Sequence, residues 1–188
     1  MRLPTLKYEE LTARQRESWD HHSSRRETVR GPYTVWLHDP DLMDKVSAIS
    51  NYFRFDCALP VKLREFGILV TARYWDAQYS WNAHVDKARA AGIPDEVIRD
   101  LAAKKKPKFK ADDERVFYEF AMEALEKHFV SEKTFAEAKS IFGTKGVVDL
   151  IGAVGYFSML QICLNSAEVD LQTDLEPPFA DVRGYRKT

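Results

Sequence analysis

Apolar residues in the middle of the chain recur at steps of three and four, the period of an amphipathic helix. The segment after Pro60 gives the clearest case. Its apolar side chains at this spacing, ending in an aromatic pair, are Leu63, Phe66, Leu69, Val70, Tyr74 and Trp75. No alternation of apolar and polar residues, the pattern of a strand, competes in this region. The pattern therefore predicts an all-α fold.

Prolines, acids and glycines predict where the helices begin and end, because proline and acidic residues favour a first turn and glycine favours the position after the last. The expected helices cover about residues 12–23, 41–53, 60–75, 77–91, a short run from 94, 112–125, 131–143 and 146–165. Residues 33–40 are expected to form an irregular apolar strip that packs on the rest. His21 and His22 are expected to be solvated.

With 188 residues and 45% hydrophobic composition, the chain can bury one sizeable core. We expect an N-terminal helix and arm over residues 1–40 that packs on this core, a helical domain over residues 41–170, and an irregular tail over residues 171–188. The last helix is very apolar from Val147 to Leu164, but polar residues interrupt it. Burial in a bundle or an oligomer is therefore favoured over a membrane span.

The charges of the chain balance, since 28 basic and 29 acidic residues give a formal net charge of -1. No overall field attracts nucleic acid or an acidic membrane, so neither is expected as a partner. The N-terminus lacks the apolar core of a signal peptide, and Cys57 and Cys163 have no spacing typical of a metal site or a disulfide framework. We expect a cytoplasmic protein with free thiols, without a metal or cofactor.

Glu65 and His84 are the candidate chemical groups, because a carboxylate beside an imidazole can transfer protons near neutral pH. An unbroken helix with a rise of about 1.5 Å per residue would hold them about 30 Å apart along its axis. A shared site therefore requires a sharp turn near residues 75–77, or completion by another subunit. Ser80 and His84 are four residues apart and lie on one helix face in either case.

Several short segments of the chain have residue combinations that helical periodicity alone does not require. They are Gly31-Pro32-Tyr33, Trp36-Leu37-His38-Asp39-Pro40, Leu63-Arg64-Glu65 with Ile68-Leu69-Val70, Tyr79-Ser80-Trp81-Asn82-Ala83-His84 followed by Ala91-Gly92, Gly146-Val147-Val148-Asp149-Leu150, and Asn165. In these segments, which cover most of the chain, it resembles the carboxymuconolactone decarboxylase family. That family shares its fold with the AhpD alkylhydroperoxidases, so the resemblance implies an AhpD-like helical bundle with an N-terminal arm.

The chain departs from both branches of that family. In the peroxidase branch a Cys-x-x-Cys pair lies between the glutamate and the histidine, and the corresponding residues here are Ala77 and Ser80. Neither can supply the thiolate and resolving thiol that peroxide reduction needs. In the branch without cysteines, the motif keeps Tyr79, Trp81 and His84 but has Ser80 where a second carboxylate often occurs.

The resemblance implies decarboxylation, or a related acid-base reaction, on a small carboxylated or lactone-like compound. The catalytic residues would be Glu65, His84 and Ser80. The substrate-binding residues would be Tyr79, Trp81 and His38. An enzyme of the carboxy-lyase type is expected, although the missing second carboxylate leaves open a non-catalytic oligomeric binder of small ligands. Antioxidant activity of the alkylhydroperoxidase (peroxiredoxin) type is a further alternative, which the absent thiols oppose.

The amount of apolar surface predicts a homo-oligomer. The helix from Val147 to Leu164 and the aromatic strip from Tyr33 to Trp36 carry more apolar surface than one small helical domain readily covers. The family resemblance implies a trimer or a hexamer, with a dimer also open.

Overall fold

The structure is a computed structural model that describes residues 1–26, 28–171 and 178–180. All regular secondary structure in this part of the chain is helical, which confirms the all-α expectation. The helices are α1 (Ala13–Arg26), α2 (Pro32–Trp36), α3 (Pro40–Asn51), α4 (Val61–Tyr74), α5 (Gln78–Ala90), α6 (Asp95–Ala102), α7 (Asp112–Met122) and α8 (Glu132–Ser166). A 3-10 turn covers Tyr8–Glu10, and π-helical turns cover Tyr52–Asp56 and Glu123–Lys127.

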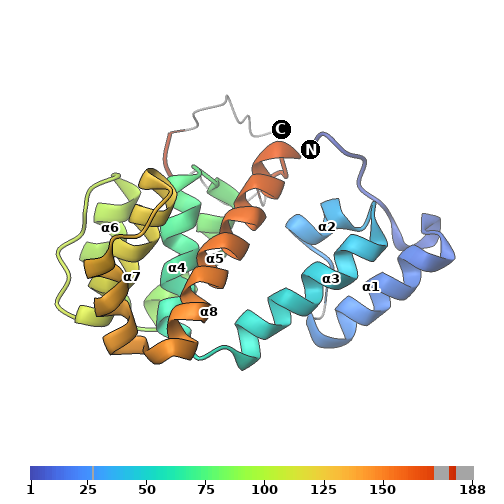
Figure 1. The fold of residues 1–188 in the computed structure, drawn as a ribbon. Helices are drawn as coiled ribbons and strands as arrows, with labels where there is room; N and C mark the ends of the chain where they lie inside the picture. Colours follow the sequence, from blue (N-terminus) through green and yellow to red (C-terminus); the bar gives the residue numbers. More distant parts are fainter. Residues whose placement is uncertain (27, 172–177, 181–188) are drawn as a thin grey trace.

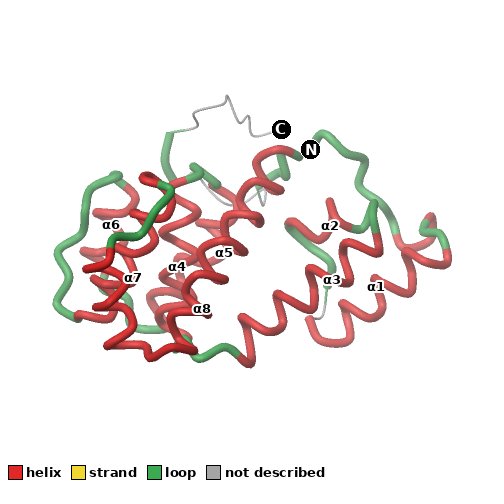
Figure 2. The backbone as a smooth tube through the Cα atoms, viewed as in Figure 1, coloured by secondary structure: helices red, strands yellow, loops and turns green. Residues whose placement is uncertain are grey.

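The helices form two groups that lie side by side. Helices α4 to α8 make a bundle on one side, and α1, α2 and α3 lie on the other, with α3 leading back toward the bundle (Figure 1; Figure 2). Both groups contribute to one continuous hydrophobic core, to which Leu11 and Leu37 belong as well as Phe66 and Phe157. The segment expected as an N-terminal arm thus packs on the same core as the rest.

Helix α4 lies at the centre of the bundle and contacts α5, α7 and α8. Its apolar residues Leu63, Phe66 and Leu69 are fully buried, as their helical spacing predicts. Gly67 allows α7 to approach, because a Cβ atom at this position would lie 2.5 Å from Cζ of Phe117. Any larger residue at position 67 would push the two helices apart.

Helix α8 contains a break at Gly143, whose φ of 68° and ψ of 177° lie outside the helical region. The sequence predicts this break, since glycine ends one expected helix and another follows at once. Helix α8 is long and apolar enough to cross a membrane by length and composition, but 56% of its most apolar window is buried inside the fold. A helix of this kind is typical of the centre of a bundle.

The strip expected over residues 33–40 differs from the observed structure, because residues 32–36 form helix α2. Pro32 occupies the first turn, where its ring favours the helical φ, and Gly31 precedes it with a φ of 60°. Most of the expected tail, residues 171–188, lies outside the described residues. Within it, Phe179 packs edge-on against Trp81 with ring centroids 5.7 Å apart.

Candidate functional site

Helices α4 and α5 form a hairpin, which is the sharp turn that a Glu65–His84 site requires. Trp75, Asp76 and Ala77 connect them, and Asp76 adopts a left-handed φ of 52°. Its carboxylate forms ion pairs with Arg73 and, at 2.8 Å, with Lys104. These contacts fix the turn and run the two helices side by side.

The hairpin brings Glu65 of α4 and His84 of α5 into direct contact. Nδ1 of His84 lies 2.7 Å from Oε2 of Glu65, and the side chains are 26% and 18% exposed. An ionised carboxylate can only accept hydrogen bonds, so Nδ1 is the donor. Among the described residues, Nε2 of His84 has no hydrogen-bond partner. This nitrogen is therefore the one available for a proton transfer.

Two opposing effects set the pKa of Glu65. Burial raises the pKa, but the hydrogen bond and charge of His84, together with the charges of Lys87 and Arg54, lower it by more than burial raises it. The net effect is a pKa below the ordinary value. Glu65 is therefore a carboxylate at neutral pH, and it holds the imidazole in place rather than supplying the proton itself.

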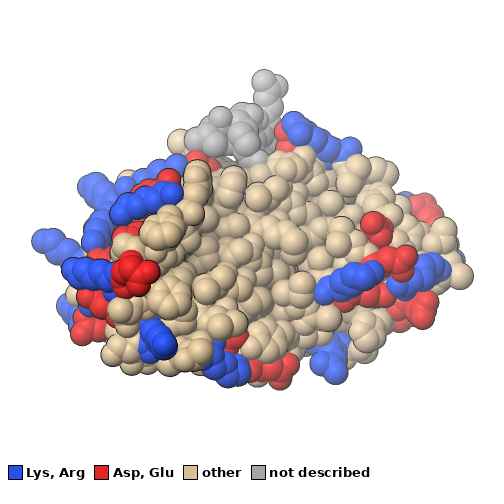
Figure 3. Space-filling model, in the orientation of Figure 1, with Lys and Arg blue, Asp and Glu red and all other residues tan. Residues whose placement is uncertain are grey.

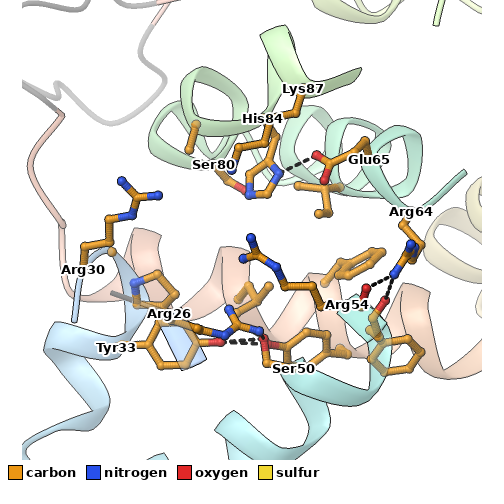
Figure 4. Close-up of a pocket in the computed structure, with 18 of the residues that line it drawn as sticks. Arg26, Arg30, Tyr33, Ser50, Arg54, Arg64, Glu65, Ser80, His84 and Lys87 are labelled. Atoms are coloured by element: carbon orange, nitrogen blue, oxygen red, sulfur yellow. Dashed lines mark hydrogen bonds and ion pairs between the residues drawn. The ribbon is translucent and has the colours of Figure 1, made fainter. Parts of the chain in front are cut away.

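The pair opens onto a cavity of about 380 Å³, a size that suits a small molecule. Residues of α4 and α5 form one wall: Glu65, Ile68, Tyr79, Ser80, Ala83, His84 and Lys87. The opposite wall comes from α1, α2, α3, the π-helical turn after α3, and α8, and includes Arg26, Tyr33, Ser50, Phe53, Arg54, Tyr156 and Phe157. Figure 4 shows these two walls facing each other, with Arg54 reaching into the space between them.

Two of the residues expected to bind the substrate, Trp81 and His38, lie outside this cavity. Trp81 does not line the cavity, because one residue past Ser80 the helix has turned by about 100°. Trp81 is instead 3% exposed, in the core against Phe179. His38 does not line the cavity either, and its Nε2 lies 3.0 Å from the carbonyl oxygen of Pro4. Tyr79 and Ser80 do line it.

The opposite wall contains a polar cluster that the sequence pattern did not reveal. Arg26 donates to Oγ of Ser50 at 2.6 Å, and the hydroxyl of Tyr33 donates to the same oxygen at 2.6 Å. The hydroxyls of Tyr33 and Tyr156 are 3.3 Å apart. Tyr33 belongs to a matching segment, but nothing in the spacing connects it to Arg26, Ser50 or Tyr156.

His22 also lines the cavity, and the expectation that it is solvated is wrong. The side chain is 3% exposed, and Nδ1 lies 3.0 Å from Oγ of Ser47. Burial, and then repulsion from Arg26 and His21, lower its pKa to about 4. His22 is therefore neutral at physiological pH. In the part of the chain that the structure describes, no three His, Cys, Asp or Glu side chains form a group able to hold a metal ion.

The all-helical bundle built around the α4–α5 hairpin defines the class of protein by its fold, which is AhpD-like. Among solved structures, this chain is similar to a protein from Ralstonia eutropha JMP134 described as an alkylhydroperoxidase AhpD core and an uncharacterized peroxidase-related protein. The two share 18% identity and a TM-score of 0.74, over 91% of this chain and 92% of the other.

An uncharacterized peroxidase-related protein from Silicibacter sp. TM1040 is similar as well, with 16% identity and a TM-score of 0.70 over 90% of this chain and 89% of that one. No protein-family model and no curated protein sequence matches this chain. At these identities the likeness concerns the fold, and the AhpD-like fold expected from the sequence is confirmed.

Proposed function

We propose that this protein is a cofactor-independent acid-base enzyme that decarboxylates, or moves a proton on, a small carboxylated or lactone-like compound. The observation that carries the proposal is the 2.7 Å contact between Glu65 and His84 on the wall of the cavity. A second-sphere carboxylate that holds an imidazole is a common arrangement for a general acid or base.

In this proposal Nε2 of His84 exchanges the proton with the substrate. When a carboxylate leaves as CO2, the electrons of the broken carbon-carbon bond stay on the substrate, and the resulting carbanion takes a proton. His84 supplies that proton and Glu65 stabilises the charged imidazole. Ser80 lines the cavity one helical turn before His84, where its hydroxyl can hydrogen-bond the substrate, and Tyr79 borders the same space.

A test of this proposal follows proton transfer directly. A panel of small carboxylated lactones and unsaturated acids is incubated with the protein in D2O, and NMR records deuterium incorporation and loss of the carboxylate. We expect His84→Gln to lower the rate by at least about a hundredfold, which is the usual contribution of a positioned acid or base. His38→Gln is the matched control, since His38 lies outside the cavity. Turnover by His84→Gln at the wild-type rate would contradict the proposal.

A non-catalytic small-ligand binder is the second candidate, and the observation that favours it is that Glu65 is the one carboxylate among the described residues lining the cavity. Ser80 occupies the place where a second carboxylate often lies in the family that the chain resembles. Ligands of this binder would bind to the cavity without any deuterium exchange, so the same experiment separates the two functions.

A further inference from the structure

We propose that the wall facing the Glu65–His84 pair is an anion subsite, in which Arg26, Tyr33 and Ser50 hold a negatively charged group at one end of an otherwise apolar ligand. The inference deepens the proposed function and rests on it for the reaction at the other end of the ligand. Anion binding at the subsite does not depend on that reaction, so its affinity can be measured without turnover.

The first argument is the imbalance of charge around the cavity. Cationic side chains line it on every side, and they are Arg26, Arg30, Arg54, Arg64 and Lys87. Of these, Arg64 has a structural role, because it donates to the backbone carbonyls of Phe53 and Arg54. Within the described residues, none of the other four forms an ion pair. Glu65 is the one carboxylate there to offset them, and it already bonds His84.

Crowding of these cations is unfavourable without a ligand. The pKa of Lys87 is lowered by desolvation first and then by repulsion from Arg30, Arg54 and Arg26, although Glu65 opposes the change. Like charges held together in a partly desolvated space are stabilised when an anion enters. An anionic ligand would therefore relieve this repulsion, whereas a neutral one would not.

The second argument is the geometry of Arg26. Its side chain is half-buried and bonds only neutral oxygens, Oγ of Ser50 at 2.6 Å and Oδ1 of Asn51 at 3.2 Å. A guanidinium has five N–H donors, so the remaining ones are available to a ligand. The two contacts hold the planar group still, and a fixed fork of this kind suits the two oxygens of a carboxylate or phosphate. Arg30, Arg54 and Lys87 are exposed, so they attract the anion toward the cavity rather than enclose it.

The third argument is the apolar lining of the cavity beside its two polar groups. Both walls also carry apolar side chains, since Phe53, Ile68, Phe157 and Leu160 line the same cavity, and Figure 4 shows the Arg26–Ser50–Tyr33 cluster on the side away from Glu65 and His84. A ligand that fits both ends has an anionic group, an apolar or aromatic body, and a reactive carbon near His84. This arrangement distinguishes it from a uniformly polar metabolite.

Isothermal titration calorimetry on the full chain tests the subsite with simple compounds. The anionic ligands are phenylacetate and phenyl phosphate, which distinguish a carboxylate from a phosphate, and the neutral match is phenylacetamide. We expect at least one anion to bind at least about tenfold more tightly than the amide, as a charge-assisted hydrogen bond predicts. Equal binding of the amide and both anions, or no saturable binding of either anion at millimolar concentration, overturns the proposal.

Matched variants assign the binding to the cluster. We expect Arg26→Gln to lose at least about tenfold in anion affinity and Arg26→Lys to keep part of it, because the lysine retains charge but not the fork. Arg25→Gln is the control, since Arg25 is the exposed neighbour of Arg26 and does not line the cavity. If Arg26→Gln does not fold, Tyr33→Phe, which removes one donor to Ser50, should still weaken anion binding. Unchanged affinity in folded Arg26→Gln or, failing that, in Tyr33→Phe contradicts the subsite.

A final variant separates this inference from the proposed function. His84→Gln is expected to bind phenylacetate or phenyl phosphate with the wild-type affinity, because its side chain lies on the other wall. Loss of turnover with retained anion binding supports both proposals. Retained turnover in His84→Gln contradicts the acid-base role alone, whereas loss of anion binding in His84→Gln contradicts the location of the subsite.

Discussion

Two adjacent histidines of α1 lie in opposite surroundings. His21 is exposed, whereas His22 is 3% exposed and has a pKa of about 4 instead of 6.5. Between these two pH values the unfolded chain binds a proton at this position that the folded chain does not. The free energy of unfolding therefore rises with pH across this window and is lost as the pH falls from about 6.5 toward 4.

From His22 alone, we expect the free energy of unfolding to fall by about 2 kcal/mol between pH 7 and pH 5. Urea denaturation at the two pH values measures it. The variant His22→Asn should lose this part of the pH dependence, and His21→Asn should keep it. Equal pH dependence in wild type and His22→Asn would show that the burial of His22 does not set its protonation.

A second prediction concerns peroxidase activity, and it depends on the residues at the two redox positions of the peroxidase motif. Ala77 and Ser80 occupy these positions, and neither side chain contains sulfur. Ala77 is fully buried and Ser80 is 5% exposed. Cys57 and Cys163 are free thiols that do not line the cavity, and burial raises the pKa of Cys163 to about 12. A thiol of this kind is a poor nucleophile at neutral pH.

We therefore expect no thiol-dependent peroxidase turnover above background in a coupled assay with an alkyl hydroperoxide and a dithiol reductant. A Cys57→Ser, Cys163→Ser double variant should behave like the wild type. Turnover that disappears in this double variant would contradict the prediction and favour the antioxidant alternative.

At the level of single helices, we expect a substitution of Gly143 to lower the stability of the fold. Its φ of 68° and ψ of 177° lie in a region that only glycine adopts readily, and no atom lies within 4 Å of a Cβ added there. The cost of Gly143→Ala is thus the conformational strain itself. Thermal and urea unfolding should report a loss of about 1–3 kcal/mol.

The neighbouring Thr144→Ala is the control for this substitution, because Thr144 is exposed and has a helical backbone. Its effect should stay within about 0.5 kcal/mol. If the two variants have the same stability, α8 runs through position 143 as an ordinary helix in solution.

The helices themselves could be predicted from the sequence, because each boundary depends on residues close to it. Pro60 and Gly92 mark the ends of the α4–α5 hairpin, and both helices lie within a few residues of the expected ranges. The strip over residues 33–40 failed because it was read from composition. In the structure Pro32 follows Gly31 in the first turn of a short helix, α2, where its ring favours the helical φ.

The site could be predicted only in part. The spacing between Glu65 and His84 indicated that a turn near residues 75–77 could bring them together, and the structure shows this contact. Such a prediction needs only the local rules for where helices end. The opposite wall joins Arg26, Ser50 and Tyr156 from three distant parts of the chain, and no periodicity encodes that meeting. Trp81 belonged to the recognised motif, but its direction depends on a 100° rotation that a motif does not contain.

On the scale of the whole molecule, the outer face of α8 is apolar. Its exposed side chains there are Val148, Ile151, Met159 and Ile162, which helical spacing places within one face. In the view of Figure 3, charged side chains lie mostly toward the two ends, and the central face over α8 carries few of them. Apolar surface of this kind on a folded protein marks an interface.

We accordingly expect a homo-oligomer, a trimer or hexamer with a dimer open, whose interface includes this face of α8. Light scattering at micromolar concentration should give a mass of at least twice the 21.7 kDa of one chain. Ile151→Glu should shift it toward the monomer, because a buried unpaired charge opposes association. Phe129→Glu is the control, since Phe129 is exposed outside α8. A wild-type mass near one chain that does not change on tenfold concentration would rule the oligomer out.

The two walls of the cavity come from separate stretches of the chain, residues 22–55 with part of α8 on one side and residues 61–87 on the other. Substitutions in the first stretch can change which ligand is held while the Glu65–His84 pair stays in place. Two proteins that share this hairpin and its pair can therefore serve different pathways. Assigning the same substrate to both proteins from the acid-base motif alone would therefore be an error. The residues to compare across relatives are those of the N-terminal helices.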